Sequence, residues 1–189
     1  MQNSKLILAS ASPRRAELLR NAGIEFEVVP AQVRESRQPG ESPEELVRRL
    51  AQEKAQSVAM RELSRLVLGA DTEVVIEGEV LGKPGDAEDA ARMLRRLSGR
   101  SHLVTTGVCL LGPGVADTRT ETTLVSFDQL SEDEIRDYIA SGEPMDKAGA
   151  YAIQGIASRW ITRLEGCYFN VVGLPVPLVY RMLQEHRAL

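Results

Sequence analysis

The sequence predicts an α/β protein built on a mixed, bent β-sheet. Segments with strand-like and helix-like patterns follow one another without strict strand–helix–strand alternation, which argues against a doubly wound parallel sheet. The chain has 189 residues, of which 43% are hydrophobic and 26% are charged, enough for one well-filled core or two closely associated lobes. Because no proline-, glycine- or serine-rich linker interrupts the sequence, we expect a single domain.

The first third of the chain is predicted to contain two strands and two helices. A short buried strand over residues 6–9 leads into a helix over about 13–22, which starts with Ser-Pro and stops at Gly23. Apolar residues alternate with glutamates over 24–28, a pattern typical of a half-buried strand. A capping box at residues 42–45 begins the second helix. The residues that follow in it at helical spacing are Leu46, Val47, Leu50, Ala51, Lys54, Ala55 and Val58.

The rest of the chain is predicted to combine hairpins with capped helices. The predicted strands lie at residues 66–68, 73–76, 80–81, 102–111 and 118–127, with two more around Glu165-Gly166. The predicted helices run from Asp86 to about 97, from the capping box at 131–134 to Gly142, and onward from about Pro175. This mixed order of elements is the basis for the mixed sheet.

Composition narrows the class of function. A formal net charge of −4 argues against a broad nucleic-acid or anionic-membrane surface, so any anion site must be local. Cys109 and Cys167 form no CxxC pattern, and we expect two reduced, buried thiols in a cytoplasmic protein. No segment approaches the roughly 20 apolar residues of a membrane span. His102 and His186 have no partner at metal-ligand spacing and receive no role.

The segment SASPRR, residues 10–15, puts cations where a helix favours acids. Ser12 and Pro13 are typical of a helix start, yet Arg14 and Arg15 follow at the positive end of the helix dipole, at a cost of a few tenths to about 1 kcal/mol each. Free N–H groups, the Ser10 hydroxyl and two guanidinium groups together would suit a phosphate-sized anion. A solvated basic pair on a surface helix is the alternative.

Four further polar residues interrupt apolar or glycine-rich segments. Asp71, in LGADTEVV, is either a capped turn residue or a group that holds a cation or water. Lys83, in GEVLGKP, and Lys54, on the inward side of its helix, are either functional charges or ordinary surface and snorkelling lysines. Gln154, in DKAGAYAIQG, presents the donor and acceptor needed to read a base edge, although a glycine-rich surface loop is the alternative.

Arginines, lysines and carboxylates together suit a polyphosphate with a divalent metal ion. The sequence contains neither a Walker motif nor GxGxxG, so neither a P-loop nor a Rossmann site is predicted. It also lacks a Ser-His-Asp order or a catalytic-cysteine signature.

Six segments, in this order, resemble the Maf family of nucleoside triphosphate pyrophosphatases: SASPRRAELL, LGADTEVV, GEVLGKP, LSGRSHLVTTGV, DKAGAYAIQG and NVVGLP. The resemblance covers residues 6–183. The combination of Arg14, Thr72 and Gln154 is similar to the subgroup acting on dTTP and UTP, rather than on 7-methyl-GTP. The family fold implied is a twisted mixed sheet with flanking helices and two lobes around a cleft, shared in outline with inosine triphosphate pyrophosphatases. Here it would occupy residues 1–189 as one domain.

The resemblance also implies roles for particular residues. The position of Asp71 is that of the catalytic base, and Lys54 and Lys83 complete the catalytic set. Glu35 and Asp71 would hold a divalent metal ion, Mg²⁺ or Mn²⁺. The substrate-binding residues implied are Ser10, Arg14, Arg15, Thr72, Lys147 and Gln154. Many family members carry additional acids just before the position of Glu35, whereas this chain reads AQVRE, so its metal shell would rely more on Asp71 and water.

The activity implied is hydrolysis of dTTP and UTP between the α- and β-phosphates, which gives a nucleoside monophosphate and pyrophosphate. We expect a cytoplasmic homodimer that binds neither nucleic acid nor membrane. Two alternatives stay open. One is a pyrophosphatase for modified or purine nucleotides, and the other is a non-catalytic nucleotide-binding regulator of cell division.

Overall fold

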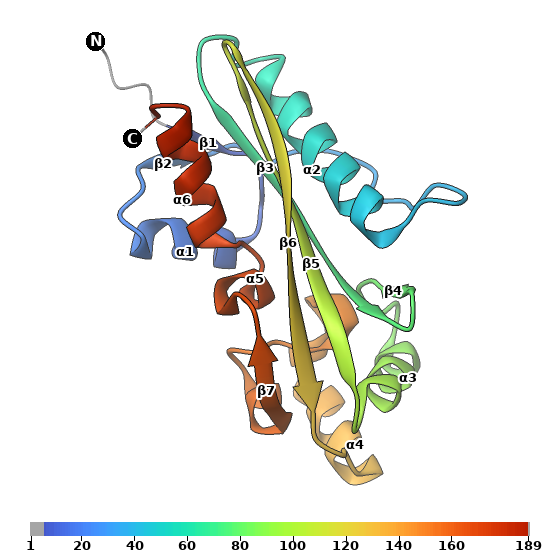
Figure 1. Ribbon diagram of the computed structural model, residues 1–189. Coiled ribbons are helices and arrows are strands. Elements are labelled where there is room, and N and C mark those ends of the chain that lie inside the picture. Colours follow the sequence, from blue (N-terminus) through green and yellow to red (C-terminus); the bar gives the residue numbers. More distant parts are fainter. Residues whose placement is uncertain (1–5, 189) are drawn as a thin grey trace. The chain divides into compact units, whose positions relative to one another are not determined.

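The structure is a computed structural model that describes residues 6–188, and its strands form one mixed sheet (Figure 1). Among the described residues the sheet has seven strands in the order β2-β1-β3-β5-β6-β7, with β4 paired to β3 off this path. Parallel pairs join β1 to β2 and to β3, whereas β3–β4 and β6–β7 are antiparallel. The predicted mixed sheet is therefore confirmed. The strands are β1 Leu6–Leu8, β2 Phe26–Val28, β3 Val67–Ile76, β4 Glu79–Leu81, β5 Ser101–Gly112, β6 Val115–Phe127 and β7 Ile161–Glu165.

Four helices begin where the sequence predicts caps. Side-chain oxygens of Ser12, Ser42, Asp86 and Ser131 each accept a hydrogen bond from a backbone N–H of the first turn, and both predicted capping boxes are formed. The α-helices are α1 Pro13–Asn21, α2 Pro43–Ala59, α3 Ala87–Leu97, α4 Glu132–Ala140, α5 Tyr168–Val172 and α6 Val176–Glu185. Short 3₁₀ turns lie at Glu143–Asp146, Ala148–Ala150 and Ile156–Trp160.

Two strand predictions are wrong in detail. The segments predicted on either side of GADT belong to one continuous strand, β3, because the buried backbone of Gly69–Asp71 stays within the sheet. The predicted half-buried strand over 24–28 is shorter: Ile24 is buried but precedes β2, and Val28 is 42% exposed.

The segment after Gly166 forms helix α5 instead of the second predicted strand. Gly166 has φ +126°, a backbone conformation that turns the chain away from β7. The buried Asn170 side chain then donates to the carbonyl of Val104 and to the hydroxyl of Thr123, which fixes this short turn. Cys167, predicted to be buried, is only partly so.

The chain divides into two compact units, each with its own core. The first unit contains residues up to Thr72, Thr106–Glu121 and the chain from Gly173 on. Its core includes Ile7, Ala9, Ala51, Ala55, Val58, Val67 and Cys109.

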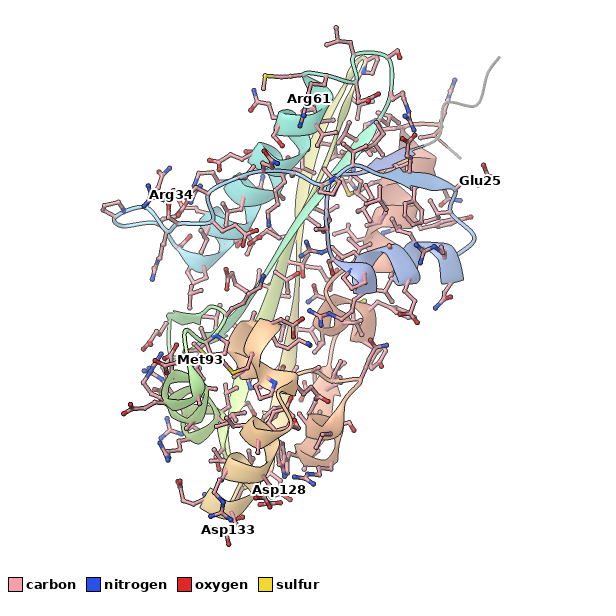
Figure 2. All side chains as sticks on the ribbon, turned by 180° about the vertical axis from the view of Figure 1, so that it is seen from behind. Glu25, Arg34, Arg61, Met93, Asp128 and Asp133 are labelled. Carbon is pink, nitrogen blue, oxygen red and sulfur yellow. The ribbon has the colours of Figure 1, made fainter. Side chains whose placement is uncertain are left out.

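The second unit contains Glu73–Thr105 and Thr122–Val172. Met93 of α3 lies in its core, whereas charged side chains such as Asp133 extend outward (Figure 2). The aromatic members of that core are Phe127, Tyr138, Tyr151 and Trp160.

Candidate active site

Helix α2 lies unusually close to strand β3 in the first unit. A Cβ atom on Gly69 would stand 2.2 Å from the carbonyl oxygen of Ala51 and 2.7 Å from the backbone nitrogen of Ala55, so only glycine permits this approach. The approach brings Lys54, which lies between these two alanines on the inward face of α2, against the middle of β3.

Lys54 joins two predicted site carboxylates. Its Nζ lies 2.6 Å from Oδ1 of Asp71 and 2.5 Å from Oε1 of Glu35. Lys54 is 8% exposed and Asp71 is 5% exposed. Because a buried charge without a partner is energetically costly, each of these two charges stabilises the other. The sequence alternatives of a snorkelling Lys54 and of Asp71 as a capped turn residue are wrong.

The second carboxylate oxygen of Asp71 is buried and has no hydrogen-bond partner among residues 6–188. Over the same described range, no group of three or more His, Cys, Asp or Glu side chains has the arrangement of a metal site. Mg²⁺ is commonly held by one or two carboxylates together with waters and substrate phosphates. Glu35 and Asp71 therefore fit a divalent ion that takes its other ligands from solvent and substrate.

The Arg15 side chain turns inward from the start of α1 rather than into solvent. It donates four hydrogen bonds: Nε to the Gly173 carbonyl at 2.9 Å, Nη1 to Ser10 Oγ at 3.2 Å and to the Ala70 carbonyl at 2.9 Å, and Nη2 to Thr72 Oγ1 at 3.1 Å. These acceptors explain why a cation is tolerated at the positive end of the helix dipole.

Electrostatic interactions connect Arg15 with the other charges of the first unit. Burial lowers the pKa of Arg15, the carboxylates of Asp71 and Glu35 oppose this change, and Arg14 adds to it. Arg15 is buried, whereas Arg14 is half-buried. The surface basic pair offered as the alternative is therefore wrong for Arg15.

Thr72 lies directly after Asp71 on β3, and its hydroxyl is fixed from several sides. It accepts from Arg15 Nη2, lies 2.9 Å from the hydroxyl of Thr106, and is 3.2 Å from the Gly173 carbonyl. The first unit thus gathers the predicted residues Ser10, Arg14, Arg15, Glu35, Lys54, Asp71 and Thr72.

Lys83, Lys147 and Gln154 belong to the second unit. The backbone N–H of Gly149 donates to the Gly82 carbonyl at 3.0 Å, so the segments that carry Lys83 and Lys147 are neighbours. Lys83 is exposed, and Lys147 forms an ion pair with Asp146.

Gln154 is exposed, and the backbone of Ile156, two residues later, is held by a side-chain hydrogen bond. Oε1 of Glu143 accepts from the Ile156 N–H at 3.0 Å and from the Tyr138 hydroxyl at 2.8 Å. A Cβ atom on Gly155 would stand 2.1 Å from this Oε1, so any other residue at this position would require the carboxylate to shift.

A family model described as Maf-like protein matches residues 5–186 of this chain. The chain belongs to the Maf family. It is 59% identical over 180 residues to a protein of Koribacter versatilis (strain Ellin345), covering 95% of this chain and 93% of that protein. It is 52% identical over 181 residues to a protein of Geobacter sp. (strain M21), which covers 93% of this chain and 92% of that protein. Both relatives are named dTTP/UTP pyrophosphatase.

Among solved structures, this Maf chain shares its fold with the Staphylococcus aureus Ham1 protein. The TM-score is 0.54 and the sequence identity 14%, with 96% of this chain and 99% of that chain covered. Within the described residues of the Maf chain, no helix combines the length and apolar character needed to cross a bilayer.

The sequence did not predict two residues of the second unit, Glu143 and His102, that contact the DKAGAYAIQG motif or the residue after it. Glu143 precedes the DKAGAYAIQG motif, and its carboxylate accepts from the N–H of Ile156, the residue that follows the motif, a contact that no local pattern marks. His102 is 2% exposed, and its Nε2 lies 2.8 Å from the hydroxyl of Tyr151 in the same motif. Burial lowers the pKa of His102 to about 4. No sequence signal distinguished it from an ordinary strand residue.

Proposed function

We propose that this Maf protein hydrolyses dTTP and UTP between the α- and β-phosphates, and so releases a nucleoside monophosphate and pyrophosphate. The main observation in support is the buried Lys54–Asp71 ion pair. The second carboxylate oxygen of Asp71 has no hydrogen-bond partner among the described residues and can contact a reactant. The names of the relatives described above, which cover almost the whole chain, support the same reaction.

Asp71 has the geometry of a general base. Its Oδ1 is held by the ammonium of Lys54, which leaves Oδ2 to orient a water and to accept its proton. Glu35 and Asp71 would hold a divalent cation, which supplies charge neutralisation and acidifies a bound water. Lys54 keeps the two carboxylates together and limits their mutual repulsion.

The start of α1 is suited to the phosphates. Arg14 and the positive end of the α1 helix dipole offer positive charge to an anion. The hydroxyl of Ser10 accepts from Arg15 and from the Ser12 N–H, so its own proton is left to donate. Arg15 contributes charge while its N–H groups fix Ser10 and Thr72.

In this proposal, Gln154 of the second unit selects the nucleotide base, and Lys83 and Lys147 add positive charge for the phosphates. A pyrimidine presents an N3–H donor and a 4-carbonyl acceptor, and the amide of Gln154 can pair with both. Lys83 and Lys147 supply cations for the pyrophosphate that leaves. We propose that both units act as one pyrophosphatase domain, as a cytoplasmic homodimer, and gel filtration with light scattering would test the dimer.

The function is tested by measuring pyrophosphate release from UTP, dTTP, CTP, GTP and modified triphosphates, with and without Mg²⁺ or Mn²⁺. We expect release from UTP and dTTP to have the highest kcat/KM and to need a divalent ion. Preference for purine or modified nucleotides would instead support the alternative pyrophosphatase. Nucleotide binding without pyrophosphate release would support the non-catalytic regulator.

A further inference from the structure

Glu35 lies on a segment that has no helix or strand of its own. Residues 29–42 connect β2 to α2 without regular secondary structure. The Glu35 side chain is 48% exposed, although its carboxylate contacts the buried Lys54. An exposed side chain on an irregular segment loses conformational entropy when it is fixed, and this cost opposes a single Glu35 position. Other contacts must therefore hold the segment.

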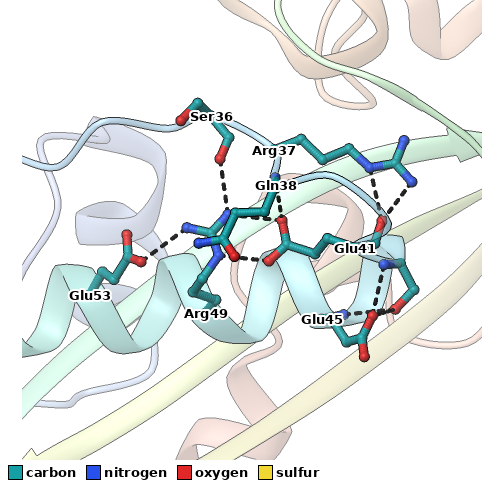
Figure 3. A network of polar contacts seen from close by, with 8 residues as sticks. Ser36, Arg37, Gln38, Glu41, Glu45, Arg49 and Glu53 are labelled. Carbon is teal, nitrogen blue, oxygen red and sulfur yellow. Dashed lines mark hydrogen bonds and ion pairs between the residues drawn. The ribbon is translucent and has the colours of Figure 1, made fainter.

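Arg49 of α2 supplies those contacts (Figure 3). Its Nη2 donates to the carbonyl oxygen of Ser36, the residue after Glu35, at 2.9 Å. The same guanidinium binds Glu41 through two bonds, Nε to Oε1 at 2.6 Å and Nη2 to Oε2 at 2.9 Å. Nη1 reaches Glu53, one turn along the helix, at 3.0 Å.

Glu41 fixes the other end of the same segment. Its Oε2 accepts from the Gln38 N–H at 3.0 Å, and its carbonyl oxygen accepts from the Arg37 side chain (Figure 3). The Glu41 side chain is only 8% exposed, and its hydrogen bonds with Arg49 hold its pKa at about 2. The pair is partly shielded and bidentate, unlike the isolated surface ion pairs that contribute little.

We propose that Arg49 is a positioning residue that sets the Glu35 carboxylate for cation binding. Helix α2 holds this part of the chain twice: Lys54 binds the side chain of Glu35, and Arg49 binds the backbone of Ser36. Without Arg49, the carboxylate of Glu35 keeps its partner but loses the backbone restraint that fixes its direction. Partners that orient metal ligands commonly change metal affinity by about 10- to 100-fold.

The inference rests on the proposed function, which assigns Glu35 to the divalent cation. Its first consequence, a change in cation affinity, can be measured on the whole protein without nucleotide. A purely structural role for Arg49 makes a different prediction, because its loss would then weaken the protein independently of Glu35. The two explanations are separated by a double-mutant cycle.

The experiment measures Mn²⁺ binding by isothermal titration calorimetry on wild type, Arg49→Ala, Glu35→Ala and the double variant. Arg48→Ala is the matched control, because it removes the same charge from the neighbouring position of α2. We expect Arg49→Ala to bind Mn²⁺ about 10-fold more weakly and Arg48→Ala to bind it like wild type. In the Glu35→Ala background, loss of Arg49 is expected to add little.

A second variant, Arg49→Lys, keeps the charge on α2 but lacks the planar fork that binds Glu41 and Ser36 together. We expect it to weaken Mn²⁺ binding nearly as much as Arg49→Ala, with circular dichroism confirming that it is folded. Wild-type affinity in either Arg49 variant, additive effects in the cycle, or no Mn²⁺ binding by wild type would overturn the inference. Absence of pyrophosphate release from wild type would instead refute the proposed function.

Discussion

Nζ of Lys54 and Oδ1 of Asp71 lie 2.6 Å apart where both residues are buried. The pair joins helix α2 to the middle of strand β3, and the remaining oxygen of Asp71 has no hydrogen-bond partner within residues 6–188. A buried carboxylate with one oxygen engaged and one available is suited to accept a proton from a fixed direction.

Asp71→Asn is expected to lower kcat for UTP by at least about 10²-fold, because the amide cannot accept the proton of the attacking water. Pyrophosphate release under saturating substrate measures the effect, and thermal unfolding checks that the variant is folded. Asp128→Asn, which changes an exposed aspartate in the second unit, serves as control and should retain wild-type kcat. Near wild-type turnover by Asp71→Asn would exclude the general-base role.

Gln154→Ala is expected to reduce discrimination between pyrimidine and purine triphosphates more than it reduces phosphate binding. A group that hydrogen-bonds the substrate base contributes chiefly to selectivity. The measurement is kcat/KM for UTP, dTTP, CTP and GTP under one set of conditions. If the four values fall by the same factor, Gln154 does not read the base.

Glu143→Ala is expected to change selectivity in the same direction as Gln154→Ala, although Glu143 is separated from Gln154 in the sequence. The carboxylate holds the Ile156 N–H and the Tyr138 hydroxyl, and its loss frees the backbone beside Gln154. Trp160, the single tryptophan, ends the 3₁₀ turn that begins at Ile156, so its fluorescence emission should also shift. An unchanged emission and an equal loss for all nucleotides would contradict this.

Gly69→Ala is expected to lower the free energy of unfolding by about 1–3 kcal/mol, since its Cβ atom would overlap the backbone of α2. Urea unfolding measures the change. Gly85→Ala is the matched control, because a Cβ atom there meets nothing within 4 Å. Equal stability of the two variants would show that α2 can move away from β3 without cost.

His102 is expected to make the protein less stable in mild acid. Its pKa is about 4 in the folded protein because of burial, whereas an unfolded histidine has a pKa of about 6.5. Between these values the unfolded chain binds more protons, so the stabilising contribution is complete above about pH 6.5 and is lost as pH falls towards 4. The loss amounts to about 3 kcal/mol.

Urea unfolding of wild type and His102→Gln at pH 7 and pH 4.5 measures this contribution. Glutamine keeps a polar group beside Tyr151 but does not take up a proton, so the difference between the two proteins should shrink or reverse on acidification. A pH-independent difference would mean that His102 has the same pKa in both states.

Local signals predicted most elements correctly, because caps and helical spacing act over a few residues. The residues predicted at helical spacing in α2 are the ones the structure buries, Lys54 among them. Ser42 and Glu45 form the predicted capping box, and the turn at Glu77-Gly78 has the positive φ values of a hairpin turn. The order of these elements was sufficient to predict a mixed sheet.

Contacts between distant residues required the structure. Nothing in the sequence pairs Lys54 with Asp71, because their approach depends on how closely α2 packs at Gly69. The hydrogen bonds of Arg15 to Ala70 and Gly173 could not be predicted for the same reason, and its phosphate-binding role was predicted from its local position and from the family resemblance. The catalytic, substrate and metal roles of these residues all stay predictions.

In the function we propose, bond cleavage and nucleotide choice are assigned to different compact units. Lys54 and Asp71 are built on one hydrophobic core, and Gln154 and Glu143 on another. We therefore expect changes in the segment around Gln154 to leave the packing around the buried Lys54–Asp71 pair intact. If these roles hold, we expect a laboratory selection for new nucleotides to change the accepted base through the second unit while the hydrolytic chemistry of the first unit is retained.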